Sequence, residues 1–212
     1  MSTPQSFSVS YLLASLALLF SASVADAKSP KAISISNPGF EAQALASGAS
    51  EQSIEGWEVE RPHGGDPAVV LYPADGKGLV GPASAHEKAN VILLPGTQLV
   101  RQVLAETWKP NTTYKLSAHV ALAFSPGSTA VIGLAYGKAP LTTAETQELN
   151  NVVASETIPP EEQWQKLEVT FTTGTSDAFL GEPIVVFAAN SIFDAANNLL
   201  LDGFQLTSLP SR

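Results

Sequence analysis

The last strand-like stretch of this 212-residue chain reads Leu199-Leu200-Leu201-Asp202-Gly203-Phe204-Gln205-Leu206. Side chains alternate along a strand, so the pattern predicts that Asp202 shares a face with Leu200, Phe204 and Leu206. A carboxylate on an apolar face costs several kcal/mol unless it is paired, bound to a metal or protonated. The group that satisfies Asp202 is therefore the first question that the sequence raises.

A second informative stretch lies at the other end, Ile33-Ser34-Ile35-Ser36-Asn37-Pro38-Gly39-Phe40-Glu41. This stretch predicts a short strand followed by a turn, and it ends with the carboxylate of Glu41. Between the two ends, short alternating segments are separated by Pro and Gly. The clearest are 113–123 and 167–172; further strands are expected at 56–59, 68–71, 89–94, 98–104, 129–135, 184–189 and 199–206.

This pattern predicts an all-β fold, an antiparallel β-sandwich of the jelly-roll type. A jelly roll places its first and last strands side by side. Asn37, Glu41 and Asp202 are then expected to meet despite their separation in sequence. Only Leu141 to Ser155 could hold a helix, and a polar surface excursion is the alternative there.

The first 27 residues have the features of a secretory signal peptide. An apolar run from Tyr11 to Phe20 precedes an Ala25-Asp26-Ala27 cleavage pattern. A membrane anchor is the alternative, but spanning requires about 18 or more apolar residues and this run is shorter. We therefore expect residues 28–212 to form a single exported domain, secreted, periplasmic or extracellular, with no stable membrane anchor after cleavage.

Composition narrows the partners of that domain. The formal charge is −9, so neither nucleic acid nor an anionic membrane is expected as a partner. The chain also has no Cys. Without disulfides, stability must come from the core or from a bound metal. Carboxylate, amide and carbonyl oxygens are the ligands that Ca²⁺ prefers, so Asn37, Glu41 and Asp202 form a candidate calcium site. Alternatively, Asn37 caps a turn, Glu41 is solvated and Asp202 accepts backbone N–H bonds.

The chain also resembles a known family. Asn37 to Glu41 followed by Gly56-Trp57 is similar to the opening of galactose-binding-like jelly rolls in carbohydrate-binding modules. The remainder is more similar to exported domains related to the hapalindole-type (Stig) cyclases. The matching pieces are Ala89-Asn90-Val91-Ile92-Leu93, 98–103, 109–117, Gln163-Trp164, 170–174, 180–184 and Leu201-Asp202-Gly203-Phe204-Gln205-Leu206.

The resemblance implies a calcium-bound jelly roll in which Glu41 and Asp202, with Asn37 or its carbonyl, lie close to the ion. In the cyclases a C-terminal Asp is also the proposed acid that protonates a terpenoid-indole, so Asp202 becomes a catalytic candidate if the chain is cyclase-like. A homodimer is a further implied state. The chain departs from the family at Gly203, where a polar Asn is common, and between Ser47 and Ser84, and both departures weaken the cyclase reading.

Three further residues are candidates for ligand contact. Tyr72 lies in a Gly- and Pro-rich stretch, Trp108 lies at a strand-to-turn junction where exposure is expected, and His63 lies in an irregular loop. Packing on the rim is the alternative for Tyr72. Trp57 is expected in the core, and His119 is expected to be solvated.

Three functions remain open from the sequence. The first is a non-catalytic module, stabilised by calcium, that binds a carbohydrate or another small organic ligand. The second is an acid-catalysed cyclase of a hydrophobic substrate that uses Asp202. The third is an extracellular matrix or surface structural protein. A deep aromatic cavity facing Asp202 would favour the cyclase, whereas Asp202 turned towards a metal would favour the module.

Overall fold

The computed structural model describes residues 29–45, 53–60, 70–73, 84–96, 98–123, 129–142, 149–190 and 198–211. The predicted signal peptide and His63 lie outside these ranges, and Tyr72 is described by its backbone only. Within the described ranges, no helix combines the length and apolar character needed to cross a membrane.

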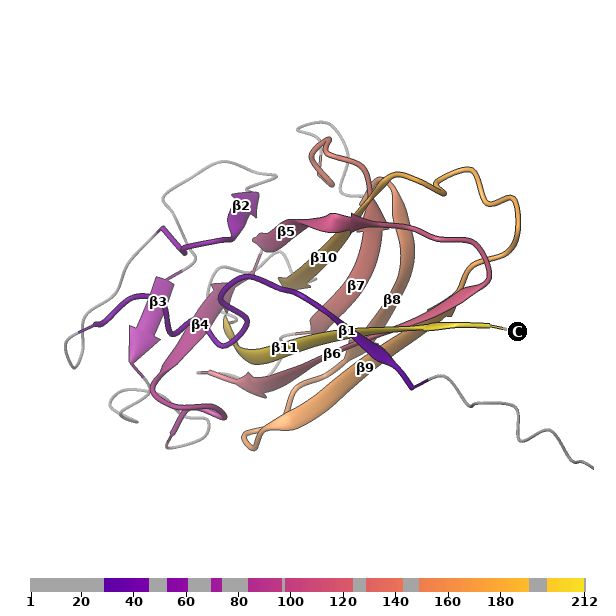
Figure 1. The fold of residues 1–212 in the computed structure, drawn as a ribbon. Helices are drawn as coiled ribbons and strands as arrows, with labels where there is room; N and C mark the ends of the chain where they lie inside the picture. The colour runs from indigo at the N-terminus through magenta and orange to yellow at the C-terminus, as the bar shows by residue number, and fades with distance from the viewer. Residues whose placement is uncertain are drawn as a thin grey trace, which may run out of the picture.

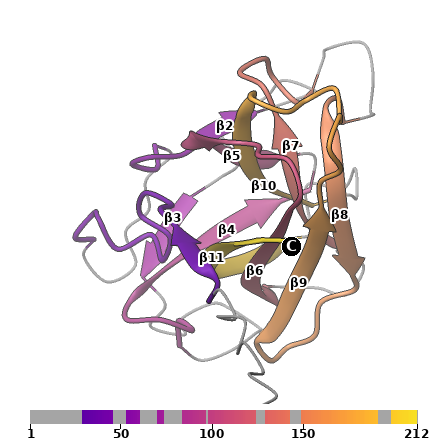
Figure 2. The ribbon, with the colours of Figure 1, turned by 45° about the vertical axis from the view of Figure 1, so that its right-hand side comes forward.

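The described residues form two antiparallel sheets that pack face to face (Figures 1 and 2). Sheet A has the strand order β3-β4-β11-β6-β9, with β1 paired to β11, and sheet B has the order β2-β5-β10-β7-β8. The strands are β1 Lys31–Ile33, β2 Glu58–Glu60, β3 Val70–Pro73, β4 Asn90–Pro95, β5 Leu99–Thr107, β6 Thr112–Leu122, β7 Ala130–Tyr136, β8 Val152–Ile158, β9 Gln165–Thr172, β10 Pro183–Asn190 and β11 Asn198–Pro210.

The predicted β-sandwich is confirmed, and its first and last strands, β1 and β11, lie side by side. β1 pairs with β11 antiparallel, with Ile33 opposite Leu206. In Figure 1 the indigo β1 crosses beside the yellow β11. The adjacency inferred from the jelly-roll class is therefore present in the structure.

One stretch differs from its prediction. Residues 152–158, part of which was a candidate helix, form β8, which pairs with β7 at the edge of sheet B. Edge strands expose one side to water, so the polar Ser155, Glu156 and Thr157 are compatible with a strand there. The polarity of the segment concealed its β structure because it lacks the apolar alternation of a central strand.

Alternation divides the apolar residues into three groups. The main core lies between the sheets and includes Ile132, Val186 and Leu201. The intervening residues of the same strands point outward, so Val131 and Phe187 belong to a smaller group on sheet B. Leu200 belongs to another small group on the outer face of sheet A. Both sheets are therefore apolar on part of their outer faces.

A β-bulge in β11 separates the face on which Asp202 lies from that of Phe204 and Leu206. Asp202 is opposite His119 and Gln205 is opposite Ser117, so two residues of β11 oppose one residue of β6. Gly203 takes the left-handed φ of 62° that this bulge requires. The expectation that Asp202 shares a face with Phe204 and Leu206 is wrong, because the extra residue turns those two into the main core.

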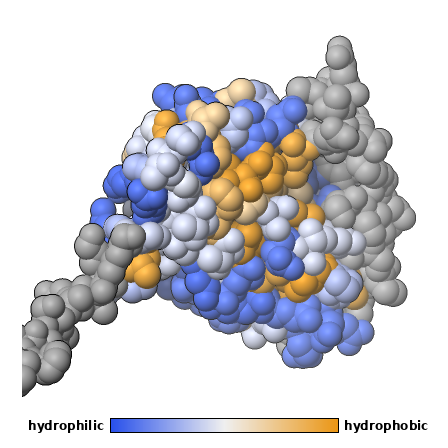
Figure 3. All heavy atoms as spheres, turned by 90° about the vertical axis from the view of Figure 1, so that its right-hand side faces the viewer, coloured by the Kyte–Doolittle hydropathy of each residue, from blue (hydrophilic) through white to orange (hydrophobic). Residues whose placement is uncertain are grey.

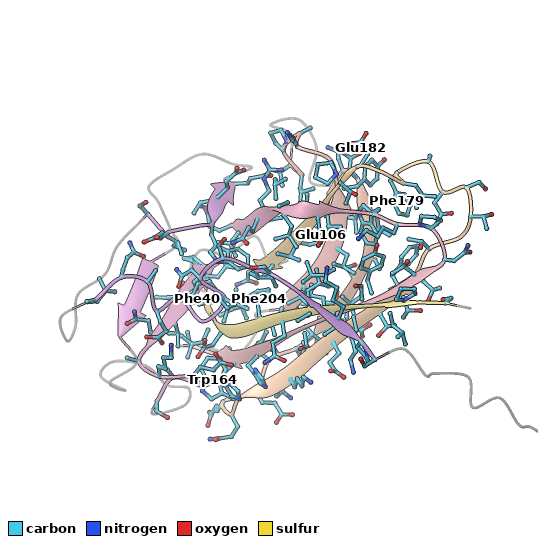
Figure 4. The ribbon with its side chains drawn as sticks, in the orientation of Figure 1. Phe40, Glu106, Trp164, Phe179, Glu182 and Phe204 are labelled. Atoms are coloured by element: carbon cyan, nitrogen blue, oxygen red, sulfur yellow. The ribbon has the colours of Figure 1, made fainter. Side chains whose placement is uncertain are left out.

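Aromatic side chains form two groups in the sandwich. Phe40 and Phe204 pack together, and Phe179 lies apart from them, to their upper right in Figure 4. Trp108 belongs to the group of Phe179, where its ring contacts Tyr114, Phe171 and Phe179. The side of the molecule shown in Figure 3 carries an apolar patch bordered by polar residues.

The expectation of an exposed Trp108 is wrong. Only 1% of its surface is accessible, and its indole N–H donates to the carbonyl of Ala135 at 3.2 Å. Trp108 directly follows β5 and precedes a turn, but its side chain packs inside the main core. Trp57 is buried, as predicted.

Candidate functional site

The turn that follows β1 is organised by Asn37. Its side-chain oxygen accepts from the Ala42 N–H at 3.0 Å, and its amide donates to the Glu55 carbonyl at 3.0 Å. Its own carbonyl accepts from the Phe40 N–H and from the Trp57 indole, each at 3.2 Å. Asn37 therefore acts within the turn through both its side chain and its backbone.

Three aromatic side chains, Phe40, Trp57 and Phe204, attach the turn to the main core. The Phe40 ring centroid lies 5.5 Å from that of Trp57 and 6.0 Å from that of Phe204, and the latter two are 4.8 Å apart. The Phe204 N–H donates to the Pro38 carbonyl at 3.0 Å, which ties the turn to β11. These contacts place the turn directly beside the bulge that carries Asp202.

Glu41 connects the turn to the start of β4. Its Oε1 accepts from the backbone N–H groups of Ala89 and Asn90 at 2.9 and 2.8 Å. The buried Asn90 side chain donates in return to the carbonyls of Phe40 and Gln43. The position of Glu41 is thus fixed by bonds to residues about 50 positions later in the sequence.

Asp202 is fully buried and only partly satisfied. Its Oδ2 accepts from the Glu87 N–H at 2.7 Å, whereas its Oδ1 has no hydrogen-bond partner among the described residues. Burial, with a further contribution from the nearby Glu87 and Glu41 carboxylates, raises the pKa of Asp202 to about 7. The structure therefore holds a carboxylate whose charge lacks compensation.

The side chains of Glu41, Glu87 and Asp202 approach Gly39. A Cβ atom on Gly39 would lie 3.1 Å from Glu87 Oε2, 3.6 Å from Asp202 Oδ1 and 3.8 Å from Glu41 Cγ. No ion pair between described residues involves any of the three acids. We call Glu41, Glu87 and Asp202 the carboxylate cluster.

Glu87 is a member that sequence reasoning missed. It precedes β4 in a stretch without strand or turn motifs, and only the three-dimensional pairing brings it to Asp202. The cluster is not a preassembled coordination shell, because no three or more His, Cys, Asp or Glu of the described ranges stand close enough to hold a metal ion. Backbone N–H groups of residues 87, 89 and 90 bind the carboxylate oxygens instead.

A cleft of about 660 Å³ is lined by two members of the carboxylate cluster, Glu41 and Glu87, whereas Asp202 is not among its described lining residues. Its described walls are the turn at 36–39 with Glu41 and Ala42, the pair Glu55-Gly56, and the pair Glu87-Lys88. The arrangement offers oxygen ligands at the floor and both an acidic and a basic side chain at the wall. Such a cleft can bind a cation, a polar molecule or both.

On the outer face of sheet A, two histidines stack beside the cluster. The His86 and His119 rings are 3.4 Å apart and nearly parallel, and the Trp164 ring meets His86 edge-on. The expected solvation of His119 is wrong, since it is half-buried and its Nδ1 is enclosed. Burial, with His86 and Lys166 nearby, lowers its pKa to about 4, so His119 is neutral at pH 7.

The sequence-predicted site residues are therefore only partly brought together. Asn37, Glu41 and Asp202 lie at the same end of the sandwich and are linked through the turn and Glu87. Trp108 lies in the core, away from the cleft. His63 and the side chain of Tyr72 lie outside the described residues, so their predicted ligand contacts remain predictions.

Comparison with known proteins identifies relatives of this fold. The HpiC1-like family model, described as HpiC1 cyclase, matches residues 31–194. Comparison with curated proteins gives no match.

Among solved structures, the Stig cyclase Fisc from Fischerella sp. TAU, bound to a pyrrolidinylidene-indole, has a TM-score of 0.68 at 20% identity. The alignment covers 87% of this chain and 100% of that chain. A Fischerella sp. TAU cyclase bound to 4-(1H-indol-3-yl)butan-2-one has a TM-score of 0.66 at 19% identity, covering 86% and 99%. TmCBM61, bound to β-1,4-galactotriose, has a TM-score of 0.52 at 15% identity, covering 82% and 97%.

Proposed function

The chain belongs to the HpiC1-like family, and we propose that it is an exported jelly-roll binding protein that calcium stabilises and that takes a carbohydrate or another small organic ligand. In this proposal Glu41, Glu87 and Asp202 hold the ion, and Asn37 supports it by shaping the turn that presents Glu41. The observation that supports the proposal is the buried Asp202, whose Oδ1 has no hydrogen-bond partner among the described residues and which lies near two further carboxylates.

The energetic argument is one of uncompensated charge. Removing a carboxylate from water is costly unless a cation or several hydrogen bonds replace the solvent. Among the described residues, Asp202 Oδ2 accepts from the Glu87 N–H and Oδ1 has no hydrogen-bond partner, while the Glu41 and Glu87 carboxylates lie nearby. A divalent cation would reverse the sign of these interactions, and hard carboxylate oxygens suit Ca²⁺.

The same ion would cross-link parts of the chain that are far apart in sequence. Glu41 follows β1, Glu87 precedes β4 and Asp202 lies in β11. Binding free energy of an ion that only the folded state can hold adds to folding free energy. An exported domain without cysteine has particular use for such a contribution.

A calcium titration followed by thermal and urea unfolding tests this proposal. The chain from residue 28, first treated with chelator, is expected to gain about 2.7 kcal/mol when free calcium reaches a hundredfold excess over its dissociation constant. Asp202→Asn and Glu87→Gln should lose this gain. Glu161→Gln makes the same charge change at an exposed corner and should keep it. An unchanged unfolding midpoint for the wild-type chain would overturn the calcium proposal.

A second candidate is acid catalysis by Asp202 on a hydrophobic substrate. Its support is the raised pKa of Asp202, which makes a protonated carboxyl available near neutral pH when no cation is bound. Against it, the carboxyl is fully buried beneath Glu87 and lies on the side of β11 away from Phe204. Conversion of a terpenoid-indole by the wild-type chain, but not by Asp202→Asn of unchanged circular dichroism, would favour this candidate.

A further inference from the structure

Residues 137–142 form a strap across the outer face of sheet B. The strap follows β7 directly, and it is bound to Arg101 in β5 and to Glu60 in β2. In the strand order of sheet B, β10 and β5 lie between β7 and β2. Arg101 is opposite Phe187, which belongs to the apolar group on the outer face, so the strap crosses the sheet on that face.

Two charged side chains hold the strap through hydrogen bonds. The Arg101 guanidinium donates to the carbonyls of residues 138 and 139 at 3.4 and 2.6 Å. The Glu60 carboxylate accepts from the N–H groups of Leu141 and Thr142 at 3.0 and 2.8 Å, and from the Thr142 hydroxyl at 2.8 Å. Because Arg101 and Glu60 are themselves 2.6 Å apart, they act together, and we call them the latch.

Leu141 is the fully buried side chain of the strap. Its neighbours Lys138, Ala139 and Pro140 are exposed, whereas Leu141 belongs to the apolar group on the outer face of sheet B. The strap is not part of a strand, so the latch and this one side chain provide most of its attachment. Segments with few buried apolar contacts open at a lower free energy than the core of a protein.

Gly137 is suited to be the hinge of the strap. Its N–H donates to the Pro183 carbonyl at 3.1 Å, which keeps this end attached to β10. Its φ is 86°, and the nearest atom to a Cβ added there is Asn151 Nδ2 at 3.9 Å. A glycine in open space can change its backbone angles without a side-chain clash.

The strap covers a surface that is unusual for the outside of a sheet. Outer faces of antiparallel sheets are commonly polar, but here Leu99, Val131 and Phe187 point outward and are buried. The Phe187 ring lies against Gly133, where an added Cβ atom would be 2.3 Å from the ring. Opening of the strap would therefore expose apolar surface rather than polar surface.

We infer that the strap opens from sheet B as a unit while the sandwich stays folded, and that the latch controls how often it opens. In the closed state Leu141 covers the apolar group on the outer face, and in the open state that group meets solvent. The inference goes beyond the proposed function, because it concerns the other sheet and uses no residue of the carboxylate cluster.

Hydrogen exchange of single backbone amides in the full chain, followed by NMR at increasing urea, tests the inference. The Leu141 and Thr142 amides report on the latch, and the Asn150 amide, which donates to the Leu141 carbonyl at 2.7 Å, reports on the strap apart from Glu60. All three should exchange faster than Val186 in the central strand β10. Their exchange should also depend less on urea, because a local opening exposes little surface.

Two variants test what holds the strap closed. Glu60→Gln should accelerate exchange at Asn150 about tenfold or more, because hydrogen bonds to a charged group are weakened. Leu141→Ala keeps the latch and should also accelerate it about tenfold or more, because buried apolar contacts are lost. Glu58→Gln is the matched control. It changes the exposed acid beside Arg101, and it should leave Asn150 exchange within about twofold.

Three results would overturn the inference. Equal urea dependence at Asn150 and Val186 would mean that the strap opens only when the whole chain unfolds. Acceleration confined to Leu141 and Thr142 in Glu60→Gln would mean that the strap does not open as a unit. An effect of Glu58→Gln as large as that of Glu60→Gln would remove the latch from its role.

Discussion

Glu60 and Asp202 are both carboxylates withdrawn from water, one on each sheet, and their surroundings are opposite in charge. The Glu60 side chain is 9% exposed, and its Oε1 lies 2.6 Å from Arg101 Nε. Its oxygens also accept from the N–H groups of Leu141 and Thr142 and from the Thr142 hydroxyl. Asp202 lies near the Glu41 and Glu87 carboxylates, and its Oδ1 has no hydrogen-bond partner in the part of the chain that the structure describes.

The difference shows how to tell a structural ion pair from a site that needs an external partner. Arg101 also donates to the carbonyls of Lys138 and Ala139, so the Glu60 carboxylate has a cation beside it and several hydrogen-bond donors. It fastens the segment after β7 across sheet B. The carboxylate cluster has comparable burial but lacks a cation of its own among the described residues. Burial alone therefore does not indicate function, whereas burial without compensation does.

The largest expected effect comes from replacing Arg101, the positively charged partner of Glu60. Arg101→Met should lower the free energy of unfolding by about 3–5 kcal/mol, because it leaves a buried charge without its partner. Urea unfolding at pH 7 measures the loss. The double variant Arg101→Met, Glu60→Gln should recover part of it by neutralising the orphaned carboxylate. A loss below about 1 kcal/mol for Arg101→Met would remove the contrast between the two sites.

The next effect concerns pH in the presence of chelator. The folded-state pKa of Asp202 is raised from 3.8 to about 7, so the folded chain holds a proton that the unfolded chain releases. This contribution is fully present below about pH 4 and is lost as the pH rises through about 7, with a limit of about 4 kcal/mol. Between pH 5 and pH 8, the wild-type chain should lose more stability than Asp202→Asn.

Urea midpoints measured at each pH for both proteins give the comparison directly. Saturating calcium should abolish the difference in slope, since the ion favours the charged carboxylate. A wild-type stability that rises between pH 5 and pH 8 relative to Asp202→Asn would contradict the raised pKa.

A smaller effect is expected at the bulge. Gly203→Ala should cost about 1–2 kcal/mol for a left-handed backbone, plus the crowding of a Cβ atom 3.0 Å from Glu87 Oε1 and 3.2 Å from His119 Nδ1. Gly181→Ala is the matched control, because Gly181 has a φ of 86° and nothing within 4 Å of its Cβ position. Thermal unfolding should show a larger loss for Gly203→Ala. Equal losses would mean that the space beside Glu87 is not restricted.

The smallest effect is expected at the exposed partner of Arg101. Glu58 lies 2.7 Å from Arg101, but its side chain is 61% exposed. Water screens such pairs, so Glu58→Gln should change the free energy of unfolding by less than about 1 kcal/mol. Glu60→Gln, tested by the same urea unfolding, should be clearly more harmful. Similar values for the two variants would show that burial does not distinguish them.

Much of the fold could be predicted because it follows from local pattern. The alternation in β6 and β9 and the Pro and Gly between segments indicated the strands, and the inference of a jelly roll placed Glu41 near Asp202. β8 could not be predicted from the same signal, because an edge strand tolerates polar residues on both sides. The expected exposure of Trp108 was wrong for a related reason. Its neighbours in sequence are turn residues, whereas its neighbours in space are Tyr114, Phe171 and Phe179.

The sequence by itself determined the sandwich, the meeting of its two ends and the presence of an acid in the last strand. Only the tertiary structure decided what surrounds that acid. One extra residue at Gly203 turns Phe204 and Leu206 into the main core and leaves Asp202 on the outer face of sheet A, where the Glu87 N–H donates to it and Gly39 lies beside it. Strand periodicity is a property of neighbouring residues, whereas a bulge and the charges around it depend on pairing between segments far apart in the chain.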